Sequence, residues 1–286
     1  MASLRDIRQK ISGITTTQQI TSAMKMMSTA RLGRAMEAIN LTHAYISKFE
    51  QMVQDLKREL PDFKHPCMVA RPVKSSCIVI IGGERGLCGG FNQDLNRFAQ
   101  GIVEDHPSPE KKIIVIGLKA IRYFEKKGIE LHAAFPDLTV KTLESELFDV
   151  SRTLFELYQT KEVDEIHLVY TSFTSAVARY LTSLRLLPID ISTMPPRPPG
   201  KSHQPFDFYP SPQEIFSQLM PRYLRNLLYR SIIESSAAEQ SARMAAMTSA
   251  TDRAEEIIDE LKLDLNRSRQ ALITREIAEV IAGSEA

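Results

Sequence analysis

The glycine-rich segment from Gly82 to Asn92 is the part of the sequence best suited to bind a phosphate. It reads Gly-Gly-Glu-Arg-Gly-Leu-Cys-Gly-Gly-Phe-Asn, follows an apolar run and precedes a helical pattern. In α/β folds this is where backbone N–H groups hold phosphate. However, no Lys-Ser or Lys-Thr follows the glycines, and the G-x-G-x-x-G pattern does not fit them. We interpret the segment as a tight, exposed strand-to-helix turn, with a nucleotide site as the less favoured alternative.

The histidines and cysteines do not indicate a second chemical site. The six histidines are scattered, and none has metal-ligand spacing to another histidine, a cysteine or a carboxylate. Cys88 has glycine neighbours and a nearby arginine, but no histidine lies close in sequence to act as its base. Cys67, Cys77 and Cys88 are odd in number, which indicates reduced thiols. The sequence therefore predicts no catalytic residue, no cofactor and no metal site.

The composition is that of an ordinary soluble protein. The 286 residues are 43% hydrophobic and 25% charged, and the formal net charge is +1. This balance gives no global attraction to nucleic acid or to an anionic membrane. No apolar run reaches the roughly 18 residues that a membrane span needs. We therefore expect no membrane-spanning segment.

The middle of the chain, residues 74–191, has the pattern of an α/β domain. Its short, continuous apolar runs are typical of strands buried on both faces, and helical segments separate them. This alternation predicts a mainly parallel, Rossmann-like layer. The predicted strands are 76–82, 112–117 and 165–170, with weaker ones at 129–135 and 183–189, and the predicted helices are 91–103, 118–127 and 143–159.

The two ends of the chain have heptad patterns of long helices. Residues 1–60 hold one apolar seam, which passes through Ile7, Ile11 and Ile14 and resumes at Leu32. Between these parts the heptad positions are polar, and Ile20, Met24 and Met27 carry the apolar side, so the apolar stripe is expected to swing round the helix and back. The polar heptad positions are Gln18, Thr21, Lys25 and Ser28.

The C-terminal helix is predicted over residues 211–286. Its seam steps alternately by three and four residues, and at roughly 1.5 Å per residue the helix would be about 100 Å long. A helix of that length must extend beyond its own domain and needs a partner. The seam positions are Met244, Met247, Thr251, Ala254, Ile258, Leu261, Leu265, Ser268 and Leu272.

The simplest partner of each long helix is the other one. The first 34 residues are basic and the last 35 carry a surplus of Asp and Glu, which favours pairing. Because the α/β domain returns the chain, we predict an antiparallel coiled coil. Two alternatives for the basic N-terminus are a solvated helix face and an organellar transit peptide.

Two shorter segments complete the predicted organisation. Residues 61–73 form a linker, and residues 192–210 form a proline-rich, extended connector. Ser211-Pro212-Gln213-Glu214 is typical of a capping box with proline in the first helical position. Pro221 lies inside the helical pattern and is expected to kink or restart the helix.

Three long motifs together resemble the gamma subunit of F-type ATP synthases. The resemblance covers the whole chain in order, with a helix, an α/β domain and a second helix. It implies the rotor of the central stalk, a non-catalytic subunit that transmits torque for ATP synthesis. The implied partners are the alpha and beta subunits, the epsilon subunit and the membrane c ring. The motifs are Ile20 to Arg31, Arg85 to Asn92, and Glu239 to Asp252 with Asn266 to Glu276.

The resemblance also implies which residues contact the surrounding subunits. These residues match the family's shaft and turn segments by position. No nucleic acid is expected as a partner. The implied rotor-stator contacts are Met24, Lys25, Arg85, Arg243, Gln270 and Thr274.

The sequence departs from the family pattern at two positions near the second long helix. Some relatives have an acidic residue where this chain has Tyr209, and Pro221 is not expected of the family. The dithiol insertion of chloroplast forms and a clear transit peptide are not apparent. We therefore expect a bacterial protein, peripheral to the cytoplasmic side of the cell membrane.

Three alternative functions remain at this point. A nucleotide-dependent enzyme would need the turn at 82–90 to bind phosphate. A nucleic-acid-binding coiled coil would use the basic residues between Arg5 and Arg34. A self-associating coiled-coil scaffold would pair its long helices between two copies of the chain.

Overall fold

The computed structural model describes residues 4–136, 143–175, 178–190, 209 and 211–284. The chain forms two compact units, one made of residues 1–30 and 243–286 and the other of residues 31–242. Both boundaries fall inside the long helices α1 (Leu4–Glu59) and α5 (Pro212–Ser284). The N-terminal part of α1 and the C-terminal part of α5 therefore form a compact unit of their own, separate from the α/β domain. The predicted connector at 192–210 lies outside the described residues, apart from Tyr209.

The sheet of the larger unit has five strands in the order β3-β2-β1-β4-β5. The first four are parallel to their neighbours, and β5 pairs antiparallel with β4. Every residue of β1 is buried, as its continuous apolar sequence predicts. The prediction of a mainly parallel sheet is confirmed. The strands are β1 Ser75–Ile81, β2 Glu110–Ile116, β3 Ala133–Phe135, β4 Glu165–Phe173 and β5 Arg179–Leu187.

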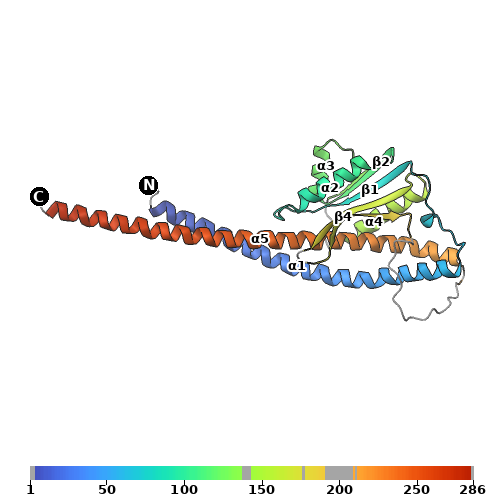
Figure 1. Cartoon of the computed structure of the whole chain (residues 1–286), viewed down its shortest axis with the longest axis horizontal. Helices are drawn as coiled ribbons and strands as arrows, with labels where there is room; N and C mark the ends of the chain where they lie inside the picture. Colours follow the sequence, from blue (N-terminus) through green and yellow to red (C-terminus); the bar gives the residue numbers. More distant parts are fainter. Residues whose placement is uncertain (1–3, 137–142, 176–177, 191–208, 210, 285–286) are drawn as a thin grey trace. The chain divides into compact units, whose positions relative to one another are not determined.

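Helices cover both faces of this sheet (Figure 1). On one face, Ile78 and Ile80 pack with α2 (Phe91–Asp105) and α3 (Leu118–Lys126). On the other face, alternate residues of β1 pack with α4 (Leu143–Gln159) and with the parts of the long helices that belong to this unit. Since side chains alternate along a strand, one apolar strand supplies both cores.

Aromatic residues join the long helices to each other within the larger unit. The ring of Phe49 stacks on Tyr223 with centroids 4.0 Å apart, and it also contacts Phe216 at 6.0 Å. Phe216 in turn contacts Phe63, which lies between α1 and the short 3-10 helix Pro66–Met68. Such offset aromatic contacts add to the stability that apolar burial supplies. They fix α1 against the first turns of α5.

The start of α5 follows the predicted capping pattern. The backbone N–H of Glu214 donates to Oγ of Ser211 at 3.3 Å, and Pro212 occupies the first helical position. Helix α5 then continues through Pro221 as one element, so of the two predicted outcomes, a kink or a restart, the restart does not occur. Pro221 has no N–H, so the carbonyl of Ser217, four residues earlier, lacks its usual helical donor. Both residues are exposed, so water can reach this part of the helix.

In the smaller unit the ends of α1 and α5 pair in an antiparallel coil (Figure 1). The predicted heptad positions from Met244 to Ser268 are all buried or half-buried, whereas the last predicted position, Leu272, is exposed. Ile7, Met247 and Ile258 are buried. Ile11, Ile14, Leu261 and Leu265 are half-buried.

The polar stretch of α1 keeps the same heptad frame. Thr21 and Ser28 are buried, and Oγ1 of Thr21 lies 2.7 Å from Oγ1 of Thr251 on the facing helix. The apolar stripe does swing round the helix, but the buried face does not follow it, since Ile20 is 56% exposed and Met27 is also exposed. The hydrogen bond between the threonines joins the two helices and favours one register.

We expect Ile258→Asp to destabilise the coil and Leu263→Asp to leave it almost unchanged. Ile258 is 7% exposed and Leu263 is 59% exposed, so only the first change buries a carboxylate. Ile258→Asp should lower the free energy of unfolding by about 2 kcal/mol or more, and Leu263→Asp by less than about 0.5 kcal/mol. Urea unfolding followed by circular dichroism measures both. Equal losses in the two variants would contradict the paired-helix seam.

Cys67, Cys77 and Cys88 are free and buried. Burial raises the pKa of the Cys77 thiol to about 12, although Lys112 opposes the shift. Burial likewise raises the pKa of Cys67 to about 11, against Arg71. The thiolate is the reactive form, so both thiols are protected by protonation as well as by packing.

A thiol reagent should therefore modify Cys67 and Cys77 very slowly in the folded chain. At pH 8, a pKa of about 12 leaves roughly one thiolate in ten thousand at Cys77. In guanidinium chloride both pKa values return to about 8.5, and modification should become at least about a hundredfold faster. Mass spectrometry of the labelled peptides separates these two cysteines from Cys88. Equal rates in the folded and unfolded chain would show that the packing is wrong.

Candidate functional site

The glycine-rich turn lies where β1 ends and α2 begins. The N–H of Gly82 donates to the carbonyl of Ile116 at 2.8 Å, which ties the turn to β2. The Asn92 side chain closes the turn, because its Nδ2 donates to the carbonyl of Arg85 at 3.0 Å. Leu87 and Gly89 both have positive φ, at 61° and 57°. The structure is therefore the tight strand-to-helix turn that the sequence predicts.

The space beside Gly83 and Gly90 is filled by the protein's own side chains. A Cβ on Gly83 would lie 2.5 Å from Oδ1 of Asn92 and 3.2 Å from Cδ of Glu239. A Cβ on Gly90 would lie 2.9 Å from the carboxylate of Asp94, in the first turn of α2. The glycines therefore allow close packing of the turn. Two carboxylates at this position repel a phosphate.

Helix α5 packs across the carboxyl ends of the parallel strands. Oγ of Ser235 donates to the carbonyl of Ile81, the last residue of β1, at 3.1 Å. Oγ of Ser172, near the end of β4, donates to Glu234 at 2.9 Å. Glu234 also pairs with Arg230, at 2.7 Å between Oε1 and Nε. Ala238 and Ala242 then pack on Phe91 and Cys88 of the turn.

This arrangement fills the position where open α/β sheets bind nucleotides. In such sheets the ligand lies at the carboxyl edge, beside the point where the strand order reverses. Here the order reverses between β1 and β4, and both ends are bonded to α5. The turn and this edge therefore serve to hold a helix, and a nucleotide enzyme is disfavoured.

The coil presents apolar side chains on its outer surface. Around Met24, the residues Ile20, Met26 and Met27 are exposed. On α5, every position from 269 to 278 is exposed. The exposed apolar residues of the tip are Leu272, Ile273, Ile277 and Val280. Apolar groups in such positions mark surfaces that bind other proteins.

The residues implied as rotor-stator contacts are spread over α1, the glycine-rich turn and α5. Met24 and Lys25 are half-buried on α1, and Arg85 is exposed on the glycine-rich turn. Gln270 and Thr274 are exposed at the tip of α5, where Oγ1 of Thr274 donates to the carbonyl of Gln270 at 3.0 Å. Arg243 is only 5% exposed, so little of its side chain is accessible to another subunit.

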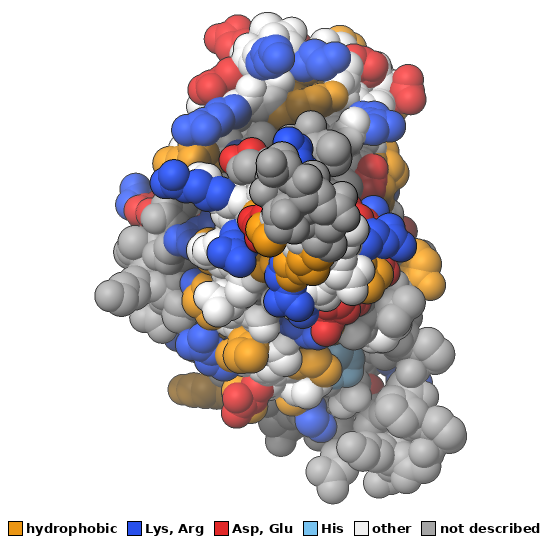
Figure 2. Space-filling model, turned by 90° about the vertical axis from the view of Figure 1, so that its left-hand side faces the viewer, with side chains coloured by type: hydrophobic (Ala, Val, Ile, Leu, Met, Phe, Trp, Pro, Cys, Tyr) orange, Lys and Arg blue, Asp and Glu red, His pale blue; other side chains and the backbone are white. Residues whose placement is uncertain are grey.

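Charged side chains are mixed on the face that Figure 2 shows. Lys and Arg lie among Asp, Glu and apolar side chains over the described surface. Nucleic-acid binding instead requires clustered Lys and Arg.

Among the described residues, none of the helices combines the length and the apolar character that a membrane span needs.

One cluster of possible ligands was missed at the sequence level. His106, Glu165 and His167 come together although their spacing did not suggest a metal site. The available signal was Glu165-Ile-His167 within a strand, because residues two apart share a face. The approach of His106, which is about 60 residues earlier in the chain, depends on tertiary structure.

Comparison with known proteins shows a full-length similarity. The family model "ATP synthase" matches residues 3–286. The ATP synthase gamma chain of Desulforamulus reducens is 36% identical over 286 residues, covering 100% of this chain and 99% of the relative. The gamma chain of Desulfitobacterium hafniense is 35% identical with the same coverage.

Solved structures show the same fold at lower sequence identity. A chain of the Euglena gracilis mitochondrial ATP synthase, described as OSCP/F1/c-ring, matches with a TM-score of 0.64 and 17% identity, covering 99% of this chain and 94% of its own. A rotor chain of the same enzyme matches with a TM-score of 0.59 and 17% identity, covering 94% and 98%. From the sequence matches, the chain belongs to the ATP synthase gamma chain family.

Proposed function

We propose that this chain is the central-stalk rotor subunit of an F-type ATP synthase. The paired ends of α1 and α5 are the shaft, and the surrounding sleeve is a ring of alpha and beta subunits. The observation that carries the proposal is the tip of α5, where helical positions 269–278 are all exposed and apolar residues have no partner in the described chain. A sleeve formed by other subunits supplies that partner.

The contacts with the ring are assigned to the shaft and the turn. We assign Met24 and Lys25, with the exposed apolar residues beside them, to the N-terminal part of the shaft. Gln270 and Thr274 belong to the tip. Arg85 extends the contact to the turn, and Arg243 contributes the least because it is almost covered.

Torque is transmitted by differential contacts. A rotor that is not symmetric touches each beta subunit differently, and each contact favours one conformation with its own nucleotide affinity. Small and polar groups at the seam, such as Thr21 and Ser28, keep the two helices close without a bulky anchor. Catalysis belongs to the partner subunits, which agrees with the filled carboxyl edge of the sheet in this chain.

The α/β domain is assigned to the foot of the rotor, beside the epsilon subunit and on the membrane c ring. A Euglena gracilis assembly with a similar chain is described as containing F1 and a c-ring. Tyr209 precedes α5 in the chain and is 89% exposed, so its side chain is available for a contact with the c ring. The chain would then be peripheral to the cytoplasmic side of a bacterial cell membrane, held there through its partners.

Recovery of the tagged full-length chain from its native membranes tests this assignment. The expected eluate contains alpha, beta and epsilon subunits and hydrolyses ATP, which the isolated chain does not. Recovery of the chain with only further copies of itself would instead favour the self-associating scaffold. Recovery with nucleic acid would favour the nucleic-acid-binding alternative.

We expect Ile20→Asp and Met27→Asp to impair the assembled complex while leaving the free chain stable. Both side chains are exposed, so their replacement should change the free energy of unfolding by less than about 0.5 kcal/mol. In a complex reconstituted with alpha and beta subunits, the buried charge should weaken assembly by at least about tenfold. Gln19→Asp is the matched control, because it adds the same charge beside Ile20 without removing an apolar side chain. Unchanged assembly in both variants would contradict a sleeve around this surface.

Shortening α5 after Gln270 tests the tip. Removal of residues 271–286 deletes the exposed apolar residues, and we expect the complex to hydrolyse ATP with reduced rotational torque. The loss should increase with successive deletions after Val280, Ile273 and Gln270, because the contacts are spread along the tip. Rotation of a probe attached to the chain, observed under increasing viscous load, measures the torque. Full torque after the longest deletion would exclude a role for the tip.

A further inference from the structure

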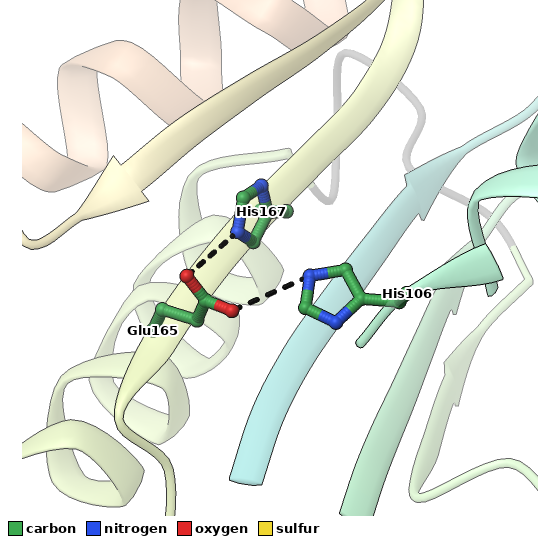
Figure 3. Close-up of side chains that lie close together, drawn as sticks. All are labelled: His106, Glu165 and His167. Carbon is green, nitrogen blue, oxygen red and sulfur yellow. Dashed lines mark ion pairs between the residues drawn. The ribbon is translucent and has the colours of Figure 1, made fainter. Parts of the chain in front are cut away.

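The cluster of His106, Glu165 and His167 lies at the amino-terminal edge of the sheet (Figure 3). Glu165 and His167 are on the same face of β4, and His106 directly follows the last turn of α2. Ser76 of β1 is the sheet neighbour of Glu165. All of these residues belong to the compact unit of residues 31–242. The cluster is thus at the opposite end of the strands from the edge that α5 covers.

The three side chains direct their donor atoms at one another. Nε2 of His106 lies 3.3 Å from Oε1 of Glu165, and Nε2 of His167 lies 3.2 Å from Oε2 (Figure 3). One donor atom from each residue lies within 4.8 Å of the other two. Around a tetrahedral metal with bonds of about 2.0–2.2 Å, neighbouring donors are separated by about 3.3–3.5 Å. The two nitrogen-to-oxygen distances are close to this separation, and each nitrogen faces a different oxygen of the carboxylate.

The hydrogen bonding of His167 is incomplete. Its Nε2 is buried and has no hydrogen-bond partner, since the approach to Glu165 lacks hydrogen-bond geometry. Buried polar atoms of this kind are rare in folded proteins, and a bound ion is one of their explanations. A metal bound between His167 and Glu165 would satisfy the nitrogen lone pair and the carboxylate charge together.

Hydrogen-bonding groups around Nδ1 of His106 hold its ring in place. Nδ1 of His106 lies 3.1 Å from Oγ of Ser108 and 3.3 Å from Oγ of Ser76. The backbone N–H of Ser108 also donates to Nδ1 at 3.4 Å, and Oγ of Ser108 donates to the carbonyl of Glu110 at 3.0 Å. These contacts hold the ring with Nε2 facing Glu165. A hydrogen bond to the other ring nitrogen is the usual support of a histidine ligand.

We propose that His106, Glu165 and His167 form a binding site for a zinc-class divalent transition metal. Two imidazoles and one carboxylate suit Zn²⁺, whereas Mg²⁺ and Ca²⁺ prefer oxygen ligands. Water completes the fourth position of such a three-ligand site. Because the ligands come from β4 and from the end of α2, the metal would join these two elements. The proposal does not depend on the rotor assignment.

Zinc titration of the full-length chain, purified without a polyhistidine tag and freed of metal by a chelator, tests the site. Calorimetry should show one saturable equivalent of Zn²⁺, with no signal for Mg²⁺. His106→Gln and His167→Gln should each weaken Zn²⁺ binding by at least about tenfold. His132→Gln is the matched control, because His132 is exposed and outside the cluster, and it should bind as the original chain does. Co²⁺ should give the visible absorption of a tetrahedral site.

A second measurement needs no variant and so does not depend on the folding of one. Diethyl pyrocarbonate modifies accessible, neutral histidines, and peptide mapping by mass spectrometry locates the modified ones. Zn²⁺ should slow the modification of His106 and His167 several-fold without changing that of His132. Absence of saturable Zn²⁺ binding, or equal modification of the cluster with and without Zn²⁺, would overturn the proposal.

Discussion

The packing of α5 against the carboxyl edge of the sheet is the contact on which the rest of the structure depends. Ser235 reaches the last carbonyl of β1, and Ala238 and Ala242 let the helix approach the glycine-rich turn closely. Larger residues at these positions would hold the helix away, and the buried Glu234 would lose Ser172 as a partner. One surface thus fixes the helix and removes the usual nucleotide site.

The same helix has different surroundings along its length, which explains its changing composition. Beside the sheet it is buried on several sides and uses Ala and Ser. In the unit of residues 1–30 and 243–286, it has one partner helix and a heptad seam. At the tip, all positions from 269 to 278 are exposed. This change in surroundings agrees with the proposed rotor role.

Several features could be predicted from local sequence, while others could not. The buried strands followed from continuous apolar runs, and the heptad frame followed from steps of three and four residues. The buried face at Thr21 and Ser28 was harder to predict. The apolar residues beside them suggested that the contact with the partner helix moves round α1. In the structure the buried face stays at the heptad positions, and a hydrogen bond joins the hydroxyls of Thr21 and Thr251 across the two helices. Polar side chains can face a partner helix when each finds a hydrogen bond.

The sequence by itself determined the order of elements, the mainly parallel sheet and the family, because periodicity and long motifs are local properties of the chain. Tertiary structure alone decided what fills the glycine-rich turn and which histidines meet. Glu239 reaches Gly83 across more than 150 residues, and His106 reaches Glu165 only because α2 ends beside β4. Such contacts depend on how helices pack on a sheet. The spacing of residues along the chain does not record that packing.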